Sequence, residues 1–163
     1  MNTIASLRHQ AHLTRIVVRL NAEGISHEES LAQPRPGGNC FNWVLGHLVA
    51  IYGEALPVLG QQPVRPREEL SHYARGAPPI TSGAEALRIE DLEKWWEESC
   101  ARFDAGLAAL PEERLAERAP RSPSDDPNET VGSLLATIVF HQAYHSGQLG
   151  VLRRVAGKPG AIK

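Results

Sequence analysis

Two histidines, His141 and His145, lie one helical turn apart in a stretch from Val131 to Val155 whose apolar side chains recur every three or four residues. This spacing predicts an amphipathic helix, and both histidines fall on the stripe that the pattern reserves for core side chains. An imidazole in a protein core needs a partner for each ring nitrogen, because an unpaired buried polar group costs about 1–3 kcal/mol. A single metal ion could satisfy both rings together.

The same spacing of two histidines occurs in zinc proteases, in which a glutamate directly follows the first histidine and serves as the general base. In this chain that position holds Gln142, whose amide cannot accept a proton at neutral pH. The sequence therefore argues against a protease of that type.

A third imidazole is available on another predicted helix. His47 lies among apolar residues, whereas the remaining histidines fall on helix flanks or in connections: His9, His12, His27 and His72. Three histidines that face one point leave a fourth position open for water or substrate, which is the arrangement of catalytic zinc sites. The alternative is that the three rings are core residues, hydrogen-bonded to serine, tyrosine and glutamine side chains.

Four predicted helices would position these side chains. Apolar periodicity and turn residues give their limits as Thr3 to Asn21, Cys40 to Leu56, Ile89 to Leu110 and Val131 to Val155. We expect Asn39 and Thr130 to cap the second and fourth helices. No run of alternating β-branched residues predicts a strand. The sequence therefore predicts an all-α four-helix bundle, in one domain spanning residues 1–163.

The connection from about Leu59 to Gly83 is unusually long for a compact domain and is rich in proline. A segment of this length can span the bundle, so we expect a long crossover between helices two and three. The helix after it carries Trp95 and Trp96, whose side chains point about 100° apart. One of the two is therefore left either for a partner subunit or for packing under the long connection.

Composition and charge exclude several classes of protein. Hydrophobic residues make up 42% of the 163 residues, charged residues make up 22%, and the net charge is −2. These values are typical of a soluble globular protein and give no basic surface for nucleic acid or for an anionic membrane. Cys40 and Cys100 fall in different predicted helices, which favours a reduced, cytoplasmic environment. We expect neither a secretory signal nor a membrane-spanning helix.

Two motifs together resemble the DinB-like superfamily of metal-binding four-helix bundles. They are the segment from Trp43 to Leu48, which contains His47, and the segment from His141 to Leu149, which is followed by Leu152-Arg153. Thr130, eleven residues before His141, matches the helix start of the family. The resemblance covers nearly the whole chain. It implies that His47, His141 and His145 bind a divalent ion such as zinc or nickel.

Relatives in this family include mycothiol-dependent maleylpyruvate isomerase and bacillithiol S-transferases, in which the metal binds a low-molecular-weight thiol. The resemblance implies a homodimeric, metal-dependent transferase or hydrolase that activates a thiol or water against a small electrophile. A non-catalytic metal-binding or stress-associated interaction protein is the alternative. The motifs identify no catalytic residue. Candidates for binding the thiol cofactor are Arg75, Arg153 and Gln148, with Arg154 beside them.

Overall fold

The computed structural model describes residues 3–162, and its long elements are four α-helices. They are α1 (Thr3–Ala22), α3 (Phe41–Ala55), α4 (Ile89–Ala109) and α5 (Val131–Val155). The connections contain one short α-helix, α2 (His27–Ser30), and the 3₁₀ helices η1 (Leu56–Leu59), η2 (Arg67–Tyr73) and η3 (Glu112–Ala116). Residues 3–162 contain no β-strand. The predicted limits of the four long helices are thus confirmed to within one residue.

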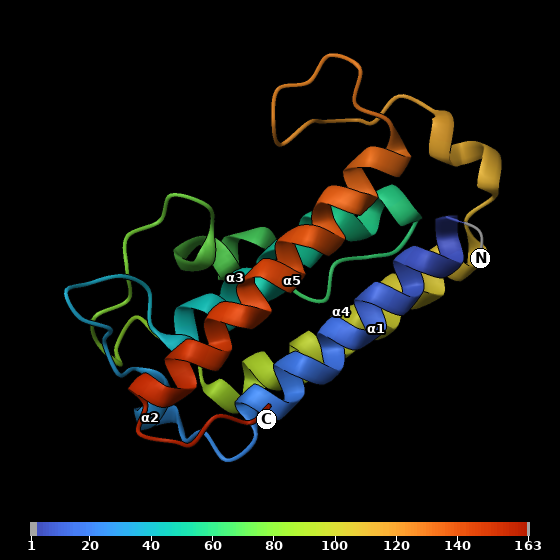
Figure 1. Cartoon of the computed structure of the whole chain (residues 1–163). Coiled ribbons are helices and arrows are strands. Elements are labelled where there is room, and N and C mark those ends of the chain that lie inside the picture. Colours follow the sequence, from blue (N-terminus) through green and yellow to red (C-terminus); the bar gives the residue numbers. More distant parts are fainter. Residues whose placement is uncertain (1–2, 163) are drawn as a thin grey trace.

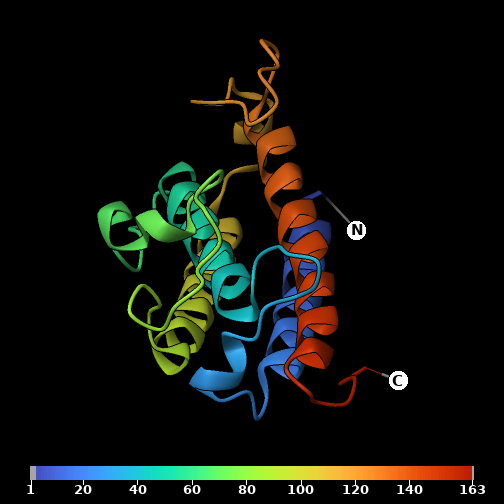
Figure 2. The ribbon, with the colours of Figure 1, turned by 90° about the vertical axis from the view of Figure 1, so that its left-hand side faces the viewer.

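The four long helices pack as a bundle with a crossover connection. Helices α1 and α5 run in the same direction and lie side by side, and so do α3 and α4, which run the opposite way (Figure 1). Because α3 and α4 are parallel, the segment that connects the end of α3 to the start of α4 must run back along the length of the bundle. The segment that returns contains η1 and η2 and packs on α3 and α4 (Figure 2). The predicted all-α four-helix bundle and its long crossover are confirmed.

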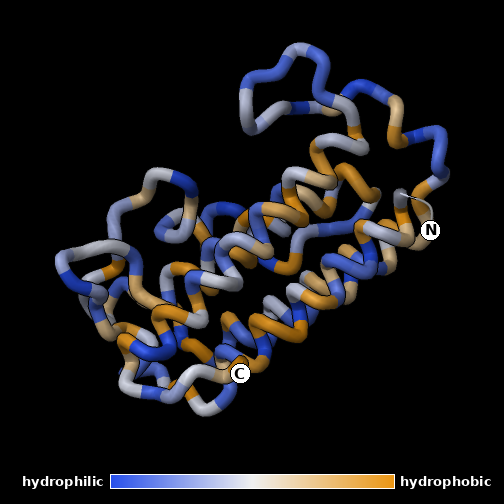
Figure 3. Tube along the Cα trace, viewed as in Figure 1, coloured by the Kyte–Doolittle hydropathy of each residue, from blue (hydrophilic) through white to orange (hydrophobic). Residues whose placement is uncertain are grey.

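The apolar faces of the helices meet in one core. Orange, apolar stretches recur along the four long helices, whereas the loop before α5 is largely polar (Figure 3). The largest fully buried side chains come from α3, α4 and the crossover: Phe41, Leu45, Leu48, Tyr52, Leu56, Tyr73, Ile80, Ile89, Leu92, Trp96, Phe103 and Leu107. Burying each large apolar side chain contributes roughly 1.5–3 kcal/mol, so this core holds the helices in register.

Thr130 caps helix α5, as the sequence predicted, and it does so in a capping box with Ser133. The side chain of Thr130 accepts a hydrogen bond from the main-chain N–H of Ser133. The sequence placed His141 and His145 on the stripe of core side chains, but the two histidines are only partly buried. Gln142 and Ser146 are the buried residues there, and His141 and His145 lie half-buried at the edge. The Nε2 of Gln142 donates to the main-chain oxygen of Leu48 at 3.0 Å, whereas its Oε1 is buried without a partner among the described residues.

Tyr73 fastens the crossover to α3. Its side chain is fully buried, its hydroxyl donates to Oδ1 of Asn42 at 2.9 Å, and the same hydroxyl accepts from the main-chain N–H of Leu87. The ring lies directly over Gly46, where a Cβ would be 2.1 Å from Cδ1 of Tyr73. Only glycine leaves this space, so the sequence of α3 determines where the crossover lies.

Two smaller expectations are settled by the packing. The residue that precedes α3 is Cys40, with no side-chain capping bond, so the expected cap at Asn39 is wrong. Trp96 is buried, whereas the ring of Trp95 lies 4.8 Å beneath the guanidinium of Arg65 in the crossover. Trp95 therefore packs under the long connection, which was the second of the two alternatives.

Within residues 3–162, each helix is too short or too polar to cross a membrane.

Candidate metal centre

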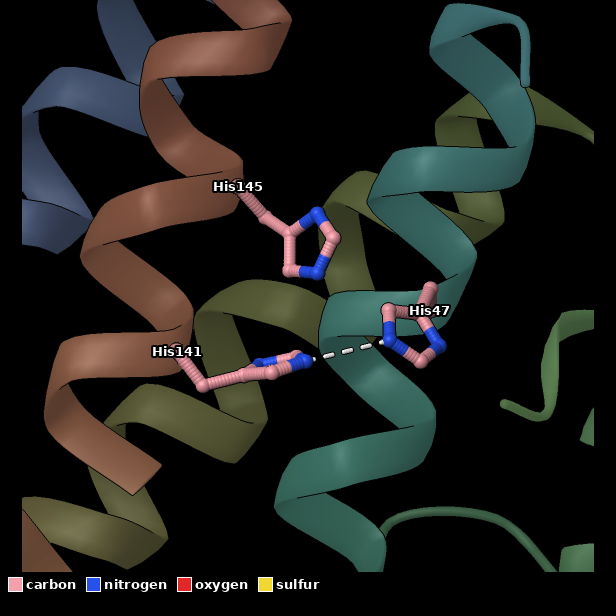
Figure 4. Close-up of side chains that lie close together, drawn as sticks. All are labelled: His47, His141 and His145. Carbon is pink, nitrogen blue, oxygen red and sulfur yellow. Dashed lines mark hydrogen bonds between the residues drawn. The ribbon is translucent and has the colours of Figure 1, made fainter. Parts of the chain in front are cut away.

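Three imidazoles converge between α3 and α5, about midway along both helices. His47 comes from α3, and His141 and His145 come from consecutive turns of α5 (Figure 4). One nitrogen from each ring lies within 4.8 Å of the other two. The Nε2 atoms of His47 and His141 are 3.2 Å apart. Nitrogens bound to one zinc ion at about 2.0–2.1 Å are separated by roughly 3.3 Å, so this pair already has the spacing of two ligands.

Hydrogen bonds on the far sides of two rings fix which nitrogen faces the cluster. Nδ1 of His47 lies 2.7 Å from the main-chain oxygen of Tyr73, and Nδ1 of His145 lies 2.6 Å from Oε1 of Gln148. A carbonyl oxygen can only accept, so both Nδ1 atoms carry the proton. Each Nε2 atom therefore presents a lone pair, as a metal ligand requires.

The tautomers and the burial of the rings fit a cation at this point. Burial lowers the pKa of His47, His141 and His145. For His141, burial together with the two neighbouring imidazoles lowers the pKa to about 4. Neutral rings are the form that binds metal. The cluster therefore has the donor set and the geometry to hold a divalent metal ion, which bears out that part of the prediction.

An aromatic side chain supports His47 from one side. The indole of Trp43, one turn earlier on α3, stacks on the His47 ring with centroids 4.8 Å apart and planes 19° apart. Trp43 is itself buried. Together with the Tyr73 carbonyl, this stack leaves the His47 ring little freedom to turn.

The three imidazoles form part of the wall of a pocket of about 850 Å³. Its apolar lining comes mainly from α3 and α5 and includes Trp43, Ile51, Ile138, Val151 and Leu152. Another part of the wall is lined by the charged residues Glu54, Arg75 and Arg121. The volume is in the range of small-molecule sites. A bound ion would therefore be accessible to a small ligand, which distinguishes this site from a closed structural one.

The sequence-predicted binding residues separate into two groups. Gln148 and Arg75 line the pocket, and Gln148 also orients His145. Arg153 lies outside the pocket lining, and its guanidinium donates to the main-chain oxygens of Asn21, Glu23 and Pro159. Arg153 thus joins the C-terminal segment to the end of α1.

Sequence reasoning did not assign roles to three other residues of the pocket: Trp43, Glu54 and Arg121. Trp43 and Glu54 could have been found, because they lie four residues before and seven residues after His47 and so share its face of α3. Arg121 gives no such signal, since it lies in an irregular loop rich in serine and proline.

Comparisons with known proteins agree with this fold. A crystal structure of a conserved protein from Enterococcus faecalis is similar over 97% of this chain and 99% of that one, with a TM-score of 0.74 and 18% sequence identity. This likeness concerns the fold. The comparison with curated proteins gives no match. The sequence profile of the DinB superfamily matches residues 9–149, a span that includes all three histidines. The chain therefore belongs to the DinB superfamily.

Proposed function

We propose that this protein is a metal-dependent enzyme of the DinB type, in which His47, His141 and His145 hold a zinc or nickel ion. The observation that carries the proposal is the convergence of three imidazole nitrogens within 4.8 Å on the wall of an open pocket. The substrate is a small electrophile, and the nucleophile is a low-molecular-weight thiol or water. When bound, the ion supplies a positive charge that lowers the pKa of such a nucleophile.

The residues of the chain supply position and enclosure. The Tyr73 carbonyl and the Gln148 amide hold Nδ1 of two ligands protonated, so that both Nε2 atoms keep a lone pair for the ion. Trp43 restricts the His47 ring by stacking on it. The apolar walls contributed by Ile51 and Leu152 limit the water around the reacting groups, which strengthens electrostatic interactions there.

Metal analysis of protein purified without a metal-affinity column tests the site. We expect about one divalent ion per chain, and we expect His145→Ala to lose it. The matched control is His12→Ala on α1, because His12 is exposed and lies outside the cluster. Full metal content in His145→Ala would contradict the ligand assignment.

A thiol-transfer screen then tests the chemistry. Mycothiol, bacillithiol and glutathione are each offered with a general electrophile such as a chlorinated nitrobenzene, and thiol consumption is followed. We expect turnover with at least one thiol, and we expect it to disappear in His145→Ala. A metal-loaded protein with no turnover on any thiol favours hydrolysis by water or the alternative, a non-catalytic metal-binding protein.

We also propose that the protein is a homodimer, as the family resemblance implies. The support in this chain is exposed apolar surface on α5, where Phe140 is 70% exposed and Val151 is 64% exposed. Exposed apolar patches of this kind commonly bind a second protein surface. Size-exclusion chromatography with light scattering gives the mass directly, and a monomer mass contradicts the proposal.

A further inference from the structure

Three charged side chains line the pocket beside the imidazoles: Arg75 from the crossover, Arg121 from the loop before α5, and Glu54 from α3. The same three residues line a second hollow of about 770 Å³, which continues along α3 and the crossover. They therefore stand at the junction of the two hollows. The metal centre does not account for them.

Arg121 has a hydrogen-bond donor that no described residue satisfies. Its Nη1 lies 3.1 Å from Oε2 of Glu54, which positions the guanidinium against α3. Its Nη2 is buried and has no hydrogen-bond partner within residues 3–162. A buried, charged donor without an acceptor is unfavourable, so this atom is suited to an acceptor on a ligand.

Arg75 reaches the same place from the crossover. It lies two residues after Tyr73, whose buried ring and hydrogen bonds determine the path of this segment. Its Nη1 donates to the main-chain oxygen of Pro123 at 3.2 Å, which brings the guanidinium against the loop that carries Arg121. Arg75 retains further N–H donors for a ligand, because a guanidinium has five.

The charges and the position of this group define what it can bind. Two guanidinium groups and one carboxylate leave a net charge of one positive unit, which one monoanion neutralises. Glu54 is seven residues after His47 on the same face of α3, and this corresponds to about 10 Å along the helix. A ligand that contacts both the imidazoles and the two arginines therefore carries its anionic group at the end opposite to the one that reacts. Between the two places the wall includes apolar Ile51.

We propose that the pocket binds a small organic acid whose carboxylate is held by Arg75 and Arg121. Guanidinium groups bind carboxylates through paired, charge-assisted hydrogen bonds, and the Nη2 of Arg121 supplies one of these donors. Glu54 reduces the positive charge, which favours a carboxylate over a dianionic phosphate. The proposal rests on the proposed function in one respect only: the molecule that carries this carboxylate is taken to be the one that reacts at the metal centre.

Calorimetric titration of the full-length protein with three matched probes tests the proposal. Hexanoate is anionic at about pH 7.5, hexanamide is its neutral counterpart, and hexylphosphonate carries more negative charge. Each probe is titrated into zinc-loaded protein and into protein treated with EDTA. We expect hexanoate to bind about tenfold more tightly than hexanamide in both forms, because the difference comes from charge-assisted hydrogen bonds to arginine.

Two variants and a matched control attribute the binding to residues. We expect Arg75→Gln and Arg121→Gln each to weaken hexanoate binding about tenfold and to leave hexanamide binding unchanged. Arg8→Gln is the control, since Arg8 lies on α1 and pairs with Asp104 away from the pocket. Melting curves establish that each variant is folded. If Arg121→Gln does not fold, Arg121→Lys keeps the charge beside Glu54, removes Nη2, and is expected to weaken hexanoate binding several-fold.

The outcomes separate this proposal from the metal function. Unchanged hexanoate binding in Arg75→Gln and in Arg121→Gln or its lysine replacement overturns it. Hexanoate binding that disappears with EDTA also overturns it, because the carboxylate then binds the metal. Tighter binding of hexylphosphonate overturns the choice of a monoanion. If the purified protein holds no metal but binds hexanoate through both arginines, the carboxylate site is supported and the metal function fails.

Discussion

Two pairs of histidines lie on helices of this bundle, His9 and His12 on α1 and His141 and His145 on α5. The spacing is three residues in one pair and four in the other, and both spacings place two side chains on one face of a helix. Yet the rings of the first pair are exposed beside Arg8 and Asp104, whereas those of the second face His47.

The difference lies in what the rest of the fold brings to each pair. The α5 pair meets a third imidazole from α3, and two of the three rings have a carbonyl oxygen at Nδ1. The α1 pair lies in a hollow whose two arginines, Arg8 and Arg15, are each paired with a carboxylate, and the residues that line this hollow include no third imidazole. Helical spacing therefore supplies two ligands at most, and a site also requires a facing ligand and oriented tautomers.

The response of the melting temperature to metal should show the largest difference between the two histidine pairs. A ligand present at about 1,000 times its Kd stabilises the folded state by roughly 4 kcal/mol. We expect zinc to raise the melting temperature of the wild-type protein clearly and EDTA to reverse the change. The double variant His141→Ala/His145→Ala should lose the response, and His9→Ala/His12→Ala should keep it. An equal response in both double variants would show that the stabilising ion binds elsewhere.

Disrupting the contact by which the crossover supports His47 is expected to have the next largest effect. Gly46→Ala places a Cβ 2.1 Å from Cδ1 of Tyr73, so the ring and the carbonyl that orients His47 must move. We expect a loss of about 1–3 kcal/mol in the free energy of unfolding, together with weaker metal binding.

Gly147→Ala is the matched control for this substitution. Gly147 lies on α5 among the histidines, and a Cβ there meets nothing within 4 Å. Alanine is the better helix former by up to about 1 kcal/mol, so this variant should be slightly more stable. Denaturant unfolding measures both variants. Equal stability of the two would mean that the Tyr73 ring can shift without loss.

Gln148 tests the contribution of an oriented tautomer to the α5 pair. Removal of its side chain in Gln148→Ala leaves Nδ1 of His145 without its acceptor, and metal affinity should fall about 10–100-fold. Gln148→Glu retains an acceptor oxygen and should keep most of the affinity. Gln10→Ala is the control on α1, where the side chain is exposed. Competition with a chromogenic chelator measures the affinities, and similar values for Gln148→Ala and Gln10→Ala would contradict this role.

The bundle and the three histidines of the cluster could be predicted because each depends on a local pattern in the sequence. Apolar periodicity identified the four long helices, and the histidine spacing identified the pair on α5. The error on α5 had a physical reason. Gln142 is polar, yet the packing of α5 against α3 buries it fully; its Nε2 donates to a main-chain oxygen of α3, and its Oε1 has no partner among the described residues.

The outer parts of the site depend on long-range contacts and could not be predicted in the same way. Tyr73 orients His47 through its main-chain oxygen, which any residue would supply, so the residue type at this position does not indicate that contact. Arg121 reaches the pocket from an irregular loop, where no periodicity indicates a direction. Gly147, which belongs to the histidine motif, has open space around it and does not crowd the site.

The smallest effect is expected from removing a charged side chain beside the histidine pair of α1. The guanidinium of Arg8 donates two hydrogen bonds to Asp104 and lowers the pKa of that carboxyl group. A depressed carboxyl pKa gives stability that is present above the unfolded pKa, about 3.9, and is lost as the pH falls through the lower folded value. Arg8→Gln should therefore be slightly less stable than the wild type at neutral pH and should match it in strong acid.

The change is small because both side chains of this pair are about half exposed to solvent, and such ion pairs are screened. Melting temperatures of the metal-free proteins across pH 2–7 provide the measurement. A larger destabilisation by Arg8→Gln than by Gly46→Ala would contradict the comparison. It would mean that the charged face of α1 and α4, and not the contact of the crossover with α3, governs the stability of the bundle.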